Sequence, residues 1–97
     1  MIIAQVIGSA VATLKHDSLK ETKLLLARPA DANGKPKGEP FLAVDLVGAG
    51  EGELVIVSQG SSARMCMPQS SSSSVDAAIV GILDSLQIDG AISFRKE

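Results

Sequence analysis

The stretch VGAGEGELVIVSQGSSAR, residues 47–64, decides which class of fold the chain adopts. Its three closely spaced glycines suit either a phosphate-binding loop or a tight turn in a β-structure. A dinucleotide-binding fingerprint needs GxGxxG between a strand and a helix, because the helix N-terminus receives the pyrophosphate. Here Glu53 occupies the place of the third glycine, and a β-branched run follows instead of a helix pattern. We therefore interpret Gly48, Gly50 and Gly52 as a structural turn between strands at residues 41–45 and 53–58.

The end of the same stretch is a second glycine turn. Gly60 can reverse the chain, Ser61 and Ser62 can present hydroxyls or backbone amides, and Arg64 adds a fixed positive charge. Taken alone, these residues are a weak signal for an anion site, and a loop satisfied by its own hydrogen bonds remains the alternative. A Walker loop is not expected, since the chain contains no Gly-Lys-Ser or Gly-Lys-Thr triplet.

Strand patterns continue on both sides of this stretch. Residues 2–15 predict a long strand that bends at Gly8 and Ser9, and residues 22–28 predict its hairpin partner. Residues 29–40 hold three prolines and an Asn33-Gly34 pair, so we expect an exposed loop with a tight turn. An Asp89-Gly90 turn precedes a final strand at residues 91–95.

Between these strands, the period of the apolar residues changes. The serine run at residues 70–74 predicts a mobile loop. Beyond it, apolar residues recur at helical spacing, and a capping-box pair at Ser73 and Asp76 precedes them. The spacing predicts one amphipathic helix carrying Val75, Ile79, Ile82, Leu83 and Leu86.

These elements predict a mainly β, single-domain fold over residues 1–97. We expect a small, partly open five-stranded β-barrel of the oligonucleotide/oligosaccharide-binding type, with one short α-helix before the last strand. A β-sandwich is the competing architecture. Phe41 and Phe94 are the two aromatic residues, and both lie in strand patterns where burial is expected.

Composition excludes several classes of function. The formal net charge is −2 and the pI about 5.3, which does not favour binding to nucleic acid or to an anionic membrane. The apolar N-terminus is too short for a membrane span and lacks a basic leader, so we expect a cytoplasmic protein. One cysteine, Cys66, and one histidine, His16, predict no disulfide, no metal site and no catalytic group, because His16 and Asp17 fit a solvated turn.

Three segments of the chain, taken together with their order and spacing, resemble one known family. DLVGAGEGELVIVSQGSSAR (residues 45–64), VDAAIVGILD (residues 75–84) and the opening IAQVIGSAVATLKHDSLKETKLLLAR (residues 3–28) are similar to the bacterial microcompartment vertex proteins of the EutN/CcmL type. These are pentameric shell proteins of carboxysomes and of ethanolamine and propanediol compartments. The serine run and the proline-rich residues 29–40 depart from the family pattern, but both fall in loops that the family varies.

The resemblance implies a non-enzymatic structural role without a cofactor. A homopentamer would close the vertices of a polyhedral shell that hexameric shell proteins otherwise tile. The resemblance also suggests a pore loop around the fivefold axis made of Gly60, Ser61, Ser62, Ala63 and Arg64. Residues 35–39 and 95–97 are candidates for contacts with neighbouring shell proteins.

The alternative function is a single-stranded nucleic-acid-binding module, because barrels of this type often bind nucleic acid. Such modules stack bases on aromatic side chains in a positively charged groove. Two phenylalanines and a net negative charge do not favour it.

Overall fold

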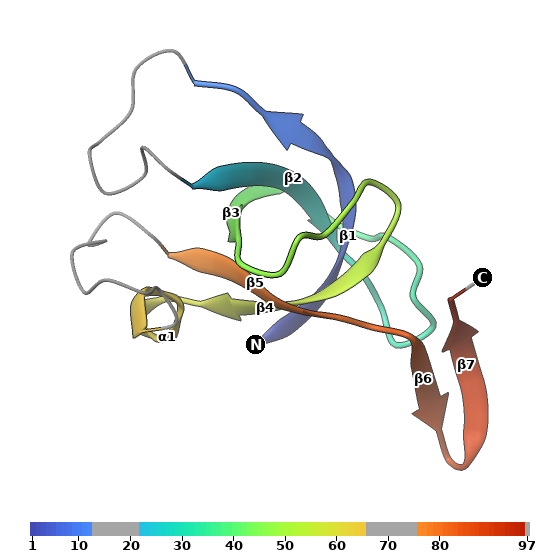
Figure 1. Cartoon of the computed structure of the whole chain (residues 1–97). Helices are drawn as coiled ribbons and strands as arrows, with labels where there is room; N and C mark the ends of the chain where they lie inside the picture. The colour runs from blue at the N-terminus through green and yellow to red at the C-terminus, as the bar shows by residue number, and fades with distance from the viewer. Residues whose placement is uncertain (13–21, 66–75, 97) are drawn as a thin grey trace.

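The computed structural model describes residues 1–12, 22–65 and 76–96, and in them five strands form a closed barrel. Around the barrel the order is β1-β2-β3-β5-β4 (Figure 1). The strands, in chain order, are β1 (Ile2–Ala10), β2 (Lys23–Pro29), β3 (Phe41–Asp45), β4 (Leu54–Gln59), β5 (Ala77–Ile82), β6 (Ser85–Ile88) and β7 (Ala91–Arg95), with one helix, α1 (Ser61–Met65), between β4 and β5. The prediction of a small five-stranded barrel with one short helix is confirmed.

The barrel closes because β1 is long enough to pair on both of its edges. Its first half pairs with β4, from Ile2↔Val57 to Gln5↔Leu54, and most of its length pairs with β2. A bulge between Val6 and Gly8 bends the strand, as the glycine predicted. The expectation of a partly open barrel is therefore wrong, although the parallel β3–β5 seam pairs at only two positions, Val44↔Ala78 and Asp45↔Ile79.

Small and β-branched side chains fill the barrel. Alternate residues along each strand point inward, and those that are fully buried include Val6, Val55, Val57 and Ile79. Phe41 packs against this cluster from the side, as expected. A second buried cluster of Val44, Ala63 and Ala78 lies on the outer face of β3 and β5, where Ala63 brings α1 against the barrel.

The predicted amphipathic helix is wrong. Of its named residues, Ile79 and Ile82 lie in β5, Leu86 lies in β6 and Leu83 lies between the two strands, whereas Val75 is outside the described residues. The helix of the fold lies earlier in the chain, at Ser61–Met65. Both faces of β5 are covered: Ala77 and Ile79 face the barrel interior, whereas Ala78 packs on the outer cluster beneath α1. A strand buried on both faces is apolar at nearly every position, so its periodicity cannot be distinguished from that of a buried helix.

β6 and β7 form a separate two-stranded hairpin that projects from the barrel; we call this hairpin, residues 85–95, the arm (Figure 1). Asp89 and Gly90 form its turn with φ values of 51° and 80°. Two consecutive positive φ angles define the hairpin turn that an Asp-Gly pair favours, so the predicted turn and the final strand are confirmed. The molecule measures 44 × 24 × 21 Å along its principal axes.

Several predictions fall on residues outside the described ranges. These are residues 13–15 of the first predicted strand, His16 and Asp17, Cys66, the serine run at residues 70–74 and the capping residue Ser73. Residues 11 and 12 are described and follow the end of β1 at Ala10, so the strand is shorter there than predicted.

Candidate functional site

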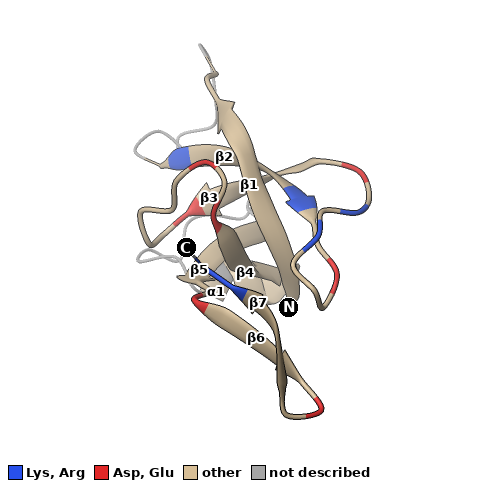
Figure 2. Ribbon diagram, turned by 90° about the vertical axis from the view of Figure 1, so that its right-hand side faces the viewer, with Lys and Arg blue, Asp and Glu red and all other residues tan. Residues whose placement is uncertain are grey.

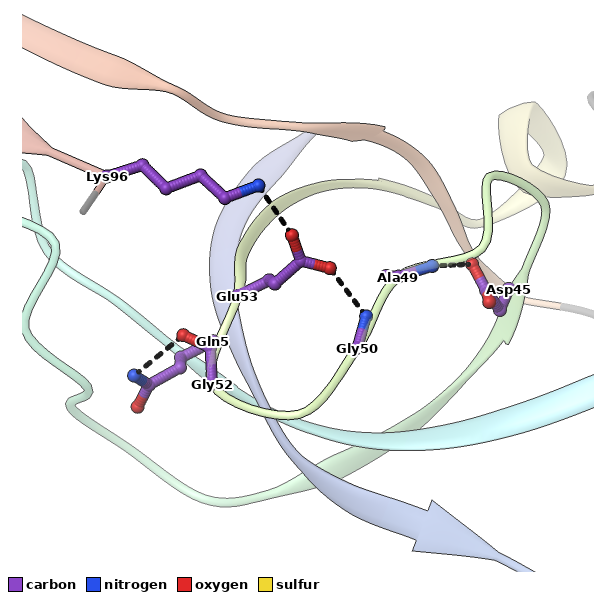
Figure 3. Close-up of polar contacts among 7 residues, drawn as sticks. All are labelled: Gln5, Asp45, Ala49, Gly50, Gly52, Glu53 and Lys96. Carbon is purple, nitrogen blue, oxygen red and sulfur yellow. Dashed lines mark hydrogen bonds and ion pairs between the residues drawn. The ribbon is translucent and has the colours of Figure 1, made fainter.

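The glycine turn between β3 and β4 is held by two carboxylates of the chain itself. One oxygen of Asp45, Oδ1, accepts the backbone N–H groups of Val47, Gly48 and Ala49 at 3.1, 3.1 and 3.2 Å. At the other end of the turn, Oε1 of Glu53 accepts the N–H of Gly50 at 2.6 Å (Figure 3). Four consecutive amides that could hold a phosphate therefore already bind the chain's own side chains.

The same turn covers one end of the barrel. Ala49 is buried and belongs to the barrel's inner cluster, while Gly52 donates its N–H to the Val6 carbonyl at 2.8 Å. Gly48 and Gly52 have φ values of 77° and 89°, a backbone region in which residues with a Cβ are strained. The glycines thus let the chain turn tightly enough to place Ala49 over the core.

The second oxygen of Glu53 forms an ion pair with Lys96, the residue that directly follows the arm. Lys96 Nζ lies 2.7 Å from Glu53 Oε2, with both side chains partly accessible to solvent. The hydrogen bond from Lys96, followed by that from the Gly50 N–H, lowers the pKa of the Glu53 carboxyl from its ordinary value. In return, the hydrogen bond to Glu53 raises the pKa of the Lys96 ammonium group.

The second glycine turn, predicted as a pore loop, directly follows β4 in the chain, whereas the first turn directly precedes it. Gly60 has a φ of 65° and donates its N–H to the Asp76 carbonyl at 2.7 Å. Ser61 and Ser62 begin α1 and are exposed, whereas Ala63 is fully buried. The buried alanine fixes the helix on the barrel and leaves the two serines on the surface.

No group of three or more His, Cys, Asp or Glu side chains that could hold a metal ion occurs in residues 1–12, 22–65 and 76–96. Within the same described part of the chain, no helix is both long and apolar enough to cross a membrane.

Sequence reasoning missed the residues that hold the glycine turn. Asp45 and Glu53 were not among the predicted site residues, and Lys96 was expected only in a tail, residues 95–97, that contacts neighbouring shell proteins, whereas it pairs with Glu53 of its own chain. A signal for Asp45 was present, because an aspartate directly before a turn often accepts the next backbone N–H groups. No local pattern could have paired Glu53 with Lys96, since the two residues lie 43 positions apart.

Comparisons with known proteins agree with this fold over the whole chain. The family model described as ethanolamine utilisation protein EutN/carboxysome matches residues 1–84. The shell vertex protein EutN of Salmonella typhimurium is 41% identical over 96 residues, which cover 99% of this chain and 96% of that protein.

Two solved structures of relatives have nearly the same fold. CcmL of Gloeobacter violaceus has a TM-score of 0.91 at 36% identity, covering 99% of this chain and 98% of that one. GrpN from Rhodospirillum rubrum, named a pentameric microcompartment shell protein, has a TM-score of 0.80 at 46% identity, covering 91% of this chain and all of the other. The chain therefore belongs to the EutN/CcmL family.

Proposed function

We propose that this chain is a structural vertex protein of a bacterial microcompartment shell and that it acts as a homopentamer. The observation that carries the proposal is similarity over almost the full length to relatives named shell vertex proteins, one of which is named pentameric. Such a role needs no catalytic residue and no cofactor. It places the protein in the bacterial cytoplasm, as part of the shell.

The geometry of a closed shell explains why a fivefold unit is needed. A flat layer of sixfold units cannot close into a polyhedron, so fivefold units must occupy its corners. A ring of five identical subunits requires two different contact surfaces on each subunit, because each copy meets its two neighbours through heterologous contacts. The hexameric shell proteins around such a vertex would be the partners of the assembled ring.

The isolated subunit exposes apolar surface that a ring would cover. A groove of about 530 Å³ is lined by Met1, Ile2, Ile3, Ala30, Ile56, Leu83 and Leu86. Leu42 and Ile92 are each about half exposed, at 49% and 48%. Apolar patches of this kind on a small protein mark sites of association. This surface supports the proposed assembly from the chain's own properties.

Native mass spectrometry tests the proposal directly. We expect a dominant species of five chains at micromolar protein concentration. A protein that stays monomeric and shifts the mobility of single-stranded DNA or RNA would contradict it.

The two phenylalanine side chains do not favour nucleic-acid binding. Phe41 packs on the core and the Phe94 ring lies against Gly34, so neither aromatic ring is an open platform for bases. Figure 2 shows Asp and Glu as well as Lys and Arg distributed over the described residues.

We further propose that Gly60, Ser61, Ser62, Ala63 and Arg64 surround the fivefold axis of the ring. The exposed serines of α1 and the buried Ala63 support this assignment, since five copies of a small polar segment fixed on a rigid barrel would line a narrow opening. The substitution Ser61→Leu should narrow that opening without unfolding the subunit, because Ser61 is exposed.

Cryo-electron microscopy of the Ser61→Leu ring would measure the central constriction. The matched control is Ser85→Leu, which changes another exposed serine, on β6. A structure that places residue 61 far from the axis, with an unchanged constriction, would refute the pore assignment and leave the pentamer intact.

A further inference from the structure

The arm depends on contacts outside itself for its position. Among the strands of the described residues, β6 and β7 pair with each other and share no hydrogen-bonded ladder with the barrel. Most of their residues are exposed or partly exposed, and an isolated two-stranded hairpin is marginally stable in water. Contacts between the arm and the rest of the chain must therefore hold the arm at one angle to the barrel.

Backbone hydrogen bonds bring the end of the arm close to the glycine turn. The N–H of Leu83, just before β6, donates to the Leu54 carbonyl at 2.9 Å. The N–H of Lys96, just after β7, donates to the Asp84 carbonyl at 2.7 Å. Both ends of the arm are thus gathered beside the start of β4, and Lys96 comes within reach of Glu53.

We infer that Glu53 is the positioning residue that fixes the arm to the barrel, with one carboxylate oxygen on the glycine turn and the other on Lys96. The Oε1–Gly50 N distance is 2.6 Å and the Oε2–Lys96 Nζ distance is 2.7 Å (Figure 3). Because one carboxylate bridges the two parts, the turn that covers the barrel end and the base of the arm become a single unit. The shifted pKa values of Glu53 and Lys96 agree with this bridge.

A second anchor lies further along β7, on the loop after β2. Ser93 Oγ donates to the Ala32 carbonyl at 2.7 Å. The ring of Phe94 lies so close to Gly34 that a Cβ on residue 34 would stand 2.6 Å from Cδ1 of the phenylalanine. With Glu53 at one side and the Ala32–Gly34 turn at the other, the arm is held at two separate places and cannot swing freely.

The two sets of contacts that hold the arm, Glu53 with Lys96 and β7 with the Ala32–Gly34 turn, are together called the clamp. The clamp also sets the shape of the apolar groove. Leu83 and Leu86, at the base of the arm, form one wall of the groove, and Ile3 and Ile56 on the barrel form part of the other. A change in the angle of the arm would open or close the space between these walls. The inference concerns the chain alone and holds whether or not it forms a ring.

Hydrogen–deuterium exchange of the full chain tests the clamp. Glu53→Gln keeps an oxygen that can accept the Gly50 N–H but removes the charge that binds Lys96. We expect the amides of the arm, residues 85–95, to exchange about twofold to fivefold faster, the range for an exposed ion pair. The exchange rates of barrel amides in β1 and β4 should not change.

Variants of the partner residue and of a neighbouring acid complete the test. Lys96→Met should accelerate exchange of the arm as Glu53→Gln does, and Lys96→Arg should restore the parent rates. Glu51→Gln is the matched control, since it removes one negative charge from the same turn.

Two further measurements separate a specific bridge from a general loss of stability. The double variant Glu53→Gln/Lys96→Met should exchange no faster than either single variant, because both remove the same interaction. The interactions lower the pKa of Glu53 in the folded protein, so the difference between parent and Glu53→Gln should be full above the ordinary value of 4.5 for this carboxyl. It should shrink as the pH falls from that value through the lowered pKa, where the folded parent becomes protonated and loses the same charge. Unchanged exchange of the arm in both single variants, or equal acceleration by Glu51→Gln, would overturn the inference.

Discussion

The substitution Ile79→Ala should lower the free energy of unfolding by about 2–5 kcal/mol, the range for truncating a fully buried isoleucine. Ile79 is 0% exposed and lies inside the barrel on β5, at the short parallel seam with β3. The barrel interior is built largely from alanine and valine, so neighbouring side chains have little length with which to fill the cavity left behind. Chemical denaturation at one fixed protein concentration would measure the loss, because assembly makes stability depend on concentration.

The matched control for this prediction is Ile88→Ala. It removes the same atoms from a side chain that is 40% exposed on the arm, and it should change the free energy of unfolding by about 0.5 kcal/mol or less. Similar losses at both positions would mean that residue 79 does not lie in the barrel core, and the strand assignment of β5 would be wrong.

Ile79 also shows where sequence reasoning succeeds and fails for this fold. Strands covered on one face, such as β2, alternate in burial and could be predicted together with their glycine and Asp-Gly turns. β5 is enclosed between the barrel interior and α1, so its apolar residues carry no period of two. The outer face of β5 is covered by α1 through Ala63, and this helix of five residues is too short to show a helical pattern in the sequence.

The candidate site was partly predictable for a similar reason. Gly48 and Gly52 have the positive φ angles that a glycine turn predicts, and their positions follow from local backbone geometry. Gly50 does not have a positive φ, so its expected conformational role in the turn is wrong. The carboxylate bridge from Gly50 through Glu53 to Lys96 joins segments that become neighbours only after the barrel has formed. The closed β3–β5 seam is likewise a long-range contact, and no turn or composition signal in either strand indicates it.

The substitution Asp45→Ala should lower the free energy of unfolding by about 1–3 kcal/mol, because it leaves several backbone N–H groups without their acceptor. Oδ1 of Asp45 accepts three of them at 3.1–3.2 Å, and the bond to Ala49 is partly buried. Once this acceptor is lost, Ala49 is no longer held in the barrel's inner cluster, so the effect should extend from the turn to the core.

The substitution Asp45→Asn provides the graded comparison, since its amide oxygen can still accept hydrogen bonds but carries no charge. We expect a smaller loss than for alanine, with only modestly faster hydrogen exchange at Val47, Gly48 and Ala49. Asp76→Ala controls for the removal of an exposed carboxylate that accepts none of these amides, and should change stability by about 0.5 kcal/mol or less. If the alanine variant at position 45 unfolds at the parent's denaturant midpoint, the carboxylate does not hold the turn, and the glycine backbone alone must determine its shape.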